Sequence, residues 1–240
     1  MITGIIVALP DEINSLTSKK LNKGDCIFIN EQTLLCCSGA GPKNAATASK
    51  FLIDKGAKRL ISWGCAAALD QQLKPGDLVL PEQLHSESKL SLLIDSPWLS
   101  HTKITLVDLK ANTGSLAESS VIVAESIAKQ EIHQQTKAVA LDMESIAVAQ
   151  TAKQHNIPVI VIRCIADPVN MDLPRAVSYA LDNQGDVILS KLLWFLLTHP
   201  SELPGLIKLG LHFNAAKNKL KLVAKHLDII VGFEQKTASK

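Results

Sequence analysis

The sequence predicts an α/β protein with three layers, in which helices flank both faces of a mixed, largely parallel sheet. Short β-rich runs alternate along the chain with segments of helical periodicity, as is typical of this class. Of the 240 residues, 47% are hydrophobic and 20% are charged, which is an ordinary globular composition. A chain of this length can bury a sizeable core within one domain.

The first third of the chain predicts four strands and one long helix. An apolar run over Gly4–Leu9 predicts a buried first strand. Two strands flank Glu31-Gln32 as a hairpin with a tight turn. Pro42 suits the first turn of a helix that runs to about Lys55. The two hairpin strands are expected at Cys26–Asn30 and Thr33–Ser38, and the fourth strand follows the helix at Arg59–Trp63.

The middle of the chain has weaker periodicity. A short strand is expected at Leu78–Leu80, after a Pro-Gly turn. Residues 82–102 show no clear period and are expected to form a long loop. A strand at Ile104–Val107 and a helix at Glu125–Gln135 are expected to follow. A strand is then expected at Ala138–Leu141, a helix at Met143–His155 and a buried strand at Val159–Cys164.

The C-terminal part predicts a helical extension over residues 201–240, after a main domain over residues 1–200. An apolar helix from Asp186 to Thr198 precedes a second helix from Gly205 to Leu227, and the final EQKTASK is expected to be frayed. Between Pro200 and Leu227, five lysines and one glutamate give a local charge of +4. Apolar side chains beside these lysines predict contact with a membrane surface. They are Leu203, Leu206, Ile207, Leu211 and Phe213. The alternative is a helix packed on the core or on a second subunit.

Composition excludes several classes of protein. A formal charge of +2 and only 4% aromatic residues argue against nucleic-acid binding. The longest apolar stretch is too short to span a membrane, and the N-terminus lacks a basic leader. The five cysteines, an odd number without a CxxC pair, predict reduced thiols and a cytoplasmic protein.

Two carboxylates follow predicted strands, where α/β proteins place their sites. Glu144 lies where a strand meets a helix, and there it could accept hydrogen bonds from two sugar hydroxyls. Asp142 and Glu144 could equally be helix caps. Asp167 follows the strand VIVIRC and could be only a turn former. Arg163 within that strand needs a carboxylate partner, for which Glu144 and Asp167 are the candidates.

These segments together resemble the paired motif of the purine nucleoside phosphorylase and methylthioadenosine/adenosylhomocysteine nucleosidase superfamily. Asp142-Met143-Glu144 is similar to its (E/D)-M-E motif, and Arg163–Asp167 to its R-x-I-S-D motif. Upstream, residues 4–12, 38–44 and 63–80 resemble its first strand, glycine turn and central strand–turn–strand. The resemblance covers roughly residues 1–200 and implies cleavage of the bond between a purine and its ribose.

The resemblance also implies roles for single residues. Glu144 would hold the ribose hydroxyls, and Asp167 would protonate N7 of the leaving purine, a form of acid catalysis worth about 10²–10⁴-fold. Met143 would pack on the sugar and Val121 and Ile122 would line the base pocket. The substrate-binding set also includes Cys65 and Arg163.

Two departures from the family pattern concern hydroxyl groups near the site. Ala166 replaces the serine before the acid, and Cys65-Ala66-Ala67-Ala68 replaces a turn of Ser or Thr followed by glycines. Either departure could lower activity or alter specificity. They motivate a rival hypothesis, in which the protein is a catalytically weak homologue that binds a ligand.

The nucleophile is left open between water and phosphate. Glu12 stands where the nucleosidases place the glutamate that activates water. Gly39, Gly41 and Lys43 form a glycine turn before a helix, which could hold phosphate as a co-substrate. We expect no metal and no other cofactor.

The tail and the site motifs most resemble the hopanoid-associated phosphorylase group. The segments that carry this resemblance are ALDMES (140–145), IADPVN (165–170) with Leu173-Pro174, and residues 199–220. This implies that the substrate is adenosylhopane, an adenosine with a lipid at its 5′ position. The alternative is a salvage nucleosidase acting on methylthioadenosine or adenosylhomocysteine. We expect a homodimer or larger homo-oligomer that contacts the inner membrane face peripherally.

Overall fold

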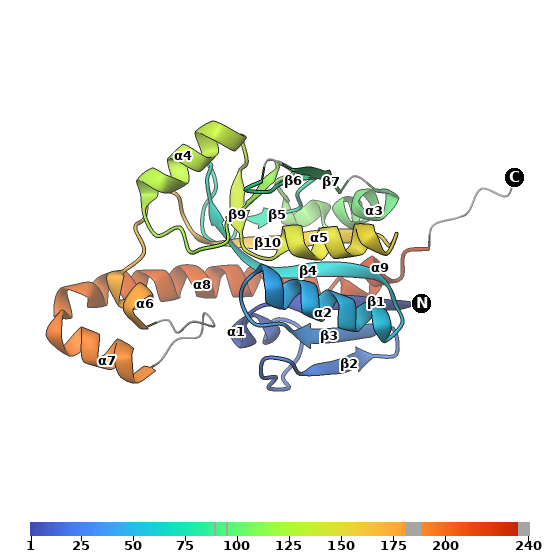
Figure 1. Ribbon diagram of the computed structural model, residues 1–240, viewed down its shortest axis with the longest axis horizontal. Helices are drawn as coiled ribbons and strands as arrows, with labels where there is room; N and C mark the ends of the chain where they lie inside the picture. Colours follow the sequence, from blue (N-terminus) through green and yellow to red (C-terminus); the bar gives the residue numbers. More distant parts are fainter. Residues whose placement is uncertain (89, 95, 181–188, 235–240) are drawn as a thin grey trace, which may run out of the picture.

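A mixed sheet with helices on both faces forms the core of the protein, which confirms the predicted class (Figure 1). The computed structural model describes residues 1–88, 90–94, 96–180 and 189–234. Its ten strands are β1 (Ile2–Val7), β2 (Cys26–Asn30), β3 (Thr33–Cys37), β4 (Ala57–Ala68), β5 (Leu78–Val79), β6 (Gln83–His85), β7 (Ser91–Leu93), β8 (Leu116–Glu118), β9 (Ala140–Asp142) and β10 (Val159–Asp167), counted over these residues.

The described helices alternate with these strands in the first two thirds of the chain and then follow one another. The α-helices are α1 (Pro10–Ile13), α2 (Pro42–Asp54), α3 (Pro97–Thr105), α4 (Ser126–Thr136), α5 (Ser145–Gln154), α6 (Arg175–Ala180), α7 (Leu189–Thr198), α8 (Leu203–Ala224) and α9 (Leu227–Val231). Short 3₁₀ turns cover Val107–Leu109 and Pro200–Glu202. The predicted helix at Asp186–Thr198 is confirmed from Leu189 on, and its first residues lie outside the described part of the chain, as does most of EQKTASK.

β4 is the central strand and organises the sheet. The strand order is β2-β3-β1-β4-β9-β8-β6-β7, and β10 and β5 join beside β4. β4 pairs in parallel with β1 and with β10, and its last two residues pair antiparallel with β9. Both β4 and β10 run further than predicted, so Cys65–Ala68 is the end of a strand rather than a turn.

The two faces of the sheet have separate apolar cores. In β1, Ile6 packs with α2 and α5 on one face, whereas Ile5 and Val7 point to the other. That second face is covered by the C-terminal half of α8 and by α9, through Ala216, Leu220, Val223, Leu227, Ile230 and Val231. The helical extension is therefore confirmed, and its second half shares the main core.

The first half of α8 leaves the sheet and projects from the molecule together with α6 and α7 (Figure 1). Exposed apolar side chains lie along this projection. They are Trp194 (63% exposed), Leu197 (78%), Leu203 (48%), Ile207 (56%) and Leu211 (65%). None of the helices in the described ranges is both long and apolar enough to cross a membrane.

Two predictions about the middle of the chain are wrong. Residues 82–102 are not a long loop, because β6, β7 and the start of α3 lie within them. Ile104–Val107 is not a strand but the end of α3 and a 3₁₀ turn. The side chain of Ser96 accepts the N–H of Leu99 at 3.1 Å and caps α3, whose first residue is a proline.

The prediction that the cysteines are reduced thiols is wrong for two of the five. Cys26 and Cys36 lie opposite each other in the β2–β3 hairpin and form a disulfide. This pairing follows from the register of two neighbouring strands, which cysteine spacing does not reveal. The hairpin itself is confirmed at the predicted positions.

Candidate active site

The segments that carry the three predicted carboxylates meet at the C-terminal end of β4. Ala67 of β4 pairs with Leu141 of β9 and with Asp167 at the end of β10. Cys65, two residues earlier, donates its backbone N–H to Glu12 of α1 at 2.7 Å. The chain thus brings together, beside one strand end, carboxylates from three distant segments.

Glu12 is almost completely buried, at 3% exposure. Its Oε1 accepts the Cys65 N–H, and its Oε2 accepts the N–H of Leu9 at 3.1 Å. Gly64 permits this approach, because a Cβ there would lie 2.8 Å from Oε1. Burial raises the pKa of Glu12, although the Cys65 N–H and the charge of Arg163 oppose the shift. A carboxylate held in this way is a suitable general base.

Glu144 and Asp142 divide the two roles that the sequence left open. Asp142 accepts the N–H and hydroxyl of Ser145 and so caps α5. Glu144 makes no side-chain cap, and its Oε1 instead accepts the N–H of Gly41 at 2.8 Å, at the start of α2. Burial and the charge of Asp142 raise the pKa of Glu144 to about 7, against the opposing effects of Arg163 and the Gly41 N–H.

The structure corrects the expected partner of Arg163, which is neither Glu144 nor Asp167. Its guanidinium is 2% exposed, donates to Asp142 Oδ2 at 2.6 Å and to the Ser62 hydroxyl at 2.8 Å. The arginine satisfies its donors within the protein and supplies a positive charge that acts on both Glu12 and Glu144. It supports the carboxylates, and a direct contact between Arg163 and the substrate stays a prediction.

Asp167 has a partner that the sequence did not indicate. The ammonium of Lys129 in α4 lies 2.7 Å from Asp167 Oδ1, and the lysine side chain is completely buried. Burial raises the pKa of Asp167 to about 6, and the charge of Lys129 limits that rise. A lysine within a helical pattern normally faces water, so this position carried no local signal.

The remaining predicted residues differ in their exposure. Met143 and Cys65 are half-buried, and burial raises the pKa of the Cys65 thiol well above its ordinary value. Val121 and Ile122 are 65% and 42% exposed and follow Ser119, whose N–H binds the carbonyl of Asp142. Their role in a base pocket stays a prediction.

The glycine turn predicted for phosphate is occupied by a protein carboxylate. Gly39 and Gly41 have positive φ angles of 79° and 93°, which suit glycine at the tight turn into α2. The N–H of Gly41 already binds Glu144, and Lys43 is exposed on the first turn of α2. An anion bound here would compete with the Glu144 carboxyl for the Gly41 N–H.

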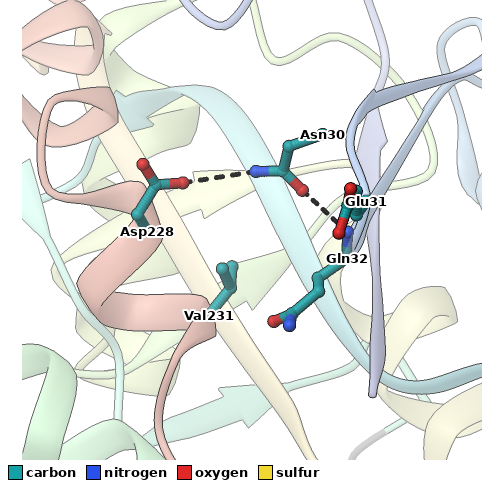
Figure 2. A pocket seen from close by; sticks show the side chains of 5 residues that line it. All are labelled: Asn30, Glu31, Gln32, Asp228 and Val231. Atoms are coloured by element: carbon teal, nitrogen blue, oxygen red, sulfur yellow. Dashed lines mark hydrogen bonds between the residues drawn. The ribbon is translucent and has the colours of Figure 1, made fainter.

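Two cavities lie elsewhere on the described surface. The first, of about 330 Å³, lies between the β2–β3 turn and α9, where the amide of Asn30 donates to Asp228 at 3.2 Å (Figure 2). The second, of about 390 Å³, lies where α4 begins and includes Asp172 and Arg175. Glu12, Glu144 and Asp167 line neither of them. The described residues also contain no group of three His, Cys, Asp or Glu side chains that could hold a metal ion.

Comparison with known proteins identifies relatives of this chain. Residues 3–187 match the model of the Phosphorylase superfamily. A 5′-methylthioadenosine/S-adenosylhomocysteine nucleosidase of Staphylococcus epidermidis is 29% identical over 198 residues, covering 70% of this chain and 86% of that protein. Its counterpart in Staphylococcus aureus is 25% identical over 197 residues, with the same coverage of 70% and 86%.

Solved structures share the fold at low sequence identity. The 5′-methylthioadenosine/S-adenosylhomocysteine nucleosidase of Neisseria meningitidis, in complex with methylthio-immucillin-A, has a TM-score of 0.71 at 19% identity and covers 95% of this chain and 99% of its own. The futalosine hydrolase of Helicobacter pylori has a TM-score of 0.69 at 17% identity, with 96% and 97% covered.

Proposed function

Because the chain belongs to the Phosphorylase superfamily, we propose that it cleaves the N-glycosidic bond of a 5′-substituted adenosine and releases adenine. One observation carries the proposal: Glu12, Glu144 and Asp167 converge on the end of β4, and the pKa of each is raised. Raised carboxyl pKa values are what proton transfer near neutral pH requires. The curated relatives, named as nucleosidases, support the same reaction class.

Asp167 is the general acid in this proposal. Adenine leaves poorly as an anion, so a proton must reach its N7 as the C–N bond breaks. A carboxyl with a pKa of about 6 is protonated in a useful fraction of molecules near neutral pH. Glu144 binds the ribose hydroxyls, and its charge stabilises the oxocarbenium-like sugar in the transition state.

Water is the nucleophile that the arrangement favours. Glu12 is a buried carboxylate with a raised pKa, as a base that activates water should be. Phosphate would need the helix N-terminus at Gly41, where Glu144 already accepts the N–H. When ionised, the carboxylate of Glu144 at that position repels an anion, so the proposal favours hydrolysis over phosphorolysis.

The 5′ group of the substrate has two candidates. The names of the relatives favour a methylthio or homocysteinyl group. The projection of α7 and the first half of α8 favours a lipid such as that of adenosylhopane, because its exposed apolar side chains lie beside lysines. A nucleosidase that acts only on small water-soluble substrates has no evident use for that surface, whereas an enzyme that takes substrate from a bilayer does.

The test is release of free adenine from 5′-methylthioadenosine and from adenosylhopane in anionic vesicles, with and without phosphate. Hydrolysis yields a reducing sugar at the same rate in both buffers, whereas phosphorolysis needs phosphate and yields a sugar 1-phosphate. Preference for the lipid substrate supports the hopanoid role, and the reverse preference supports salvage. Tight binding of both substrates without adenine release would support the ligand-binding alternative.

The same proposal includes a homo-oligomer. Apolar side chains at one end of the sheet are strongly exposed in the single chain, among them Leu93 of the edge strand β7 (77%) and Ile104 of α3 (74%). Exposed apolar surface of this kind is typical of subunit contacts. Light scattering is expected to give at least twice the mass of one chain, and Leu93→Gln is expected to weaken the association. A strictly monomeric protein would contradict this part of the proposal.

A further inference from the structure

Lys129 is a buried cation that the proposed mechanism does not yet use. Its side chain has no exposed surface in the structure, although lysine is among the residues least often buried completely. An ammonium group removed from water requires compensation for each of its three donors. The acceptors that surround it therefore indicate what it does.

All three acceptors belong to Asp167 and the loop that follows it. The Nζ group donates to Asp167 Oδ1 at 2.7 Å, to the carbonyl of Met171 at 2.8 Å and to the carbonyl of Pro168 at 3.3 Å. None of these donors is left over for a substrate. One cation thus fixes both an oxygen of the carboxyl and the backbone around it.

The start of α4 and this loop are joined by further hydrogen bonds. The N–H of Ser126, one turn before Lys129, binds Asp172 Oδ1 at 2.7 Å, and the N–H of Leu173 binds the carbonyl of Ala124 at 2.8 Å. A loop fastened at both ends and at its centre holds the carboxyl in one orientation.

We propose that Lys129 is a positioning residue that places the transferable proton on Oδ2 of Asp167. This inference rests on the proposed function, because it assumes that Asp167 protonates the purine. Oδ1 faces an ammonium N–H and cannot carry a proton towards it, so a protonated Asp167 carries its proton on Oδ2. After that proton moves to N7, the new carboxylate lies beside the positive charge. Lys129 thus orients the acid and stabilises its product.

Removal of the Lys129 charge should change the dependence of the rate on pH in a defined direction. The charged groups that act on Asp167 are Lys129 in α4, which lowers its pKa, and Asp172 in the loop, which raises it. Without Lys129 the pKa of Asp167 rises, so the acid remains protonated to higher pH. A nearby opposite charge shifts a carboxyl pKa by about one to three pH units. The pH of maximum rate and the alkaline limb of the rate profile should therefore both move to higher pH.

The experiment measures adenine release from 5′-methylthioadenosine against pH for Lys129→Met and Lys129→Gln, with Lys153→Met as a control. Lys153 is an exposed lysine of α5. Both Lys129 variants should lose at least tenfold in peak kcat while their alkaline limb moves to higher pH, and Lys153→Met should match the parent. A lower rate with an unmoved limb means that Lys129 only fills space and overturns the inference.

A second measurement needs no substrate. Asp167→Asn leaves the buried ammonium without its counter-charge, so Lys129→Met should partly restore the stability lost in Asp167→Asn, as measured by urea unfolding. Additive losses would overturn the inference even if the activity assay were silent. A parent protein that releases no adenine would refute the proposed function instead, and this cycle would still report whether the pair is coupled.

Discussion

Glu12, Glu144 and Asp167 are all made less acidic by burial, but each has a different partner. Glu12 accepts two backbone N–H groups, Glu144 accepts one at the start of a helix, and Asp167 accepts a lysine ammonium. A full positive charge favours ionisation more than a backbone dipole does. In the proposed mechanism the acid is Asp167, and the ammonium stabilises the carboxylate that remains after proton transfer.

The rate profile of the parent enzyme is expected to be a narrow bell. Asp167, with a pKa of about 6, must be protonated, and Glu144, with a pKa of about 7, must be ionised to grip the ribose. Activity should peak between these values and fall on both sides. Asp167→Asn should lower adenine release by about 10²-fold or more and flatten the alkaline limb. Near-normal turnover in this variant would show that the proton comes from another group.

Glu144→Gln is expected to lower activity and raise stability. The folded protein holds the Glu144 proton more tightly than the unfolded chain does, so stability is lost as pH rises from about 4.5 to about 7. A glutamine at this position does not titrate, so the variant does not lose stability in this way as the pH rises. Allowing for the partial exposure of the side chain, the variant should gain about 1–2 kcal/mol at pH 8 and little at pH 4.

Urea unfolding at both pH values checks this expectation, and Glu131→Gln on the exposed side of α4 is the matched control. The parent enzyme should also prefer ribonucleosides, because Glu144 binds the ribose hydroxyls. Equal activity on 2′-deoxy substrates, or a variant destabilised at pH 8, would argue against the assignment.

The site carboxylates could be predicted from sequence because each follows a strand, whereas their partners could not. Asp142 lies 21 residues before Arg163 in the sequence, and its neighbour Glu144, two residues later, has the stronger functional signal. Lys129 lies in a helix whose other charged residues are solvated, and the loop that covers it comes 38 residues later. Contacts between such distant segments depend on strand register, which local patterns do not encode.

Among the elements, α8 has two halves with different surroundings. Its second half is buried on the sheet, and its first half exposes Leu203, Ile207 and Leu211. Replacing Leu203, Ile207 and Leu211 with glutamine should reduce co-sedimentation of the protein with anionic vesicles. The same change should leave activity on 5′-methylthioadenosine unchanged. The neighbouring lysines contribute about 1 kcal/mol each near an anionic surface, so high salt should weaken binding by the parent protein.

The matched control replaces Leu222 and Ile229, which are exposed at the other end of the extension. This pair should not alter vesicle binding. A parent protein that ignores anionic vesicles would remove the case for membrane contact and leave the projection as a surface for a second subunit.

Long elements with strong periodicity were predictable, and short elements were not. The β2–β3 hairpin, α2 and α5 lie where the sequence places them, because proline, turn residues and apolar spacing agree there. β6 and β7 have three residues each, too few to show an alternating pattern. α3 carried a readable signal in Ser96-Pro97, but its mixed apolar pattern concealed the helix.

At the scale of the whole molecule, the extension completes the core. Removal of residues 201–240 exposes one face of the sheet and deletes six buried apolar side chains of α8 and α9. A buried Leu or Ile side chain contributes about 2–5 kcal/mol, and a domain is stable by only about 5–15 kcal/mol. The truncated protein should therefore be unfolded by circular dichroism. A folded, active truncation would contradict this account of the core.

The contacts of Arg59 also constrain how the protein is made on the ribosome. Its guanidinium binds the Thr3 hydroxyl and the carbonyls of Val231 and Phe233, and the Trp98 indole binds the carbonyl of Ile230. The nascent chain therefore emerges with one face of its central strands uncovered until residues 216–233 have been translated. Partly synthesised chains with exposed apolar strands aggregate readily. Cells that lack chaperones which bind nascent chains should thus lose this protein to aggregates before its last helices can fold.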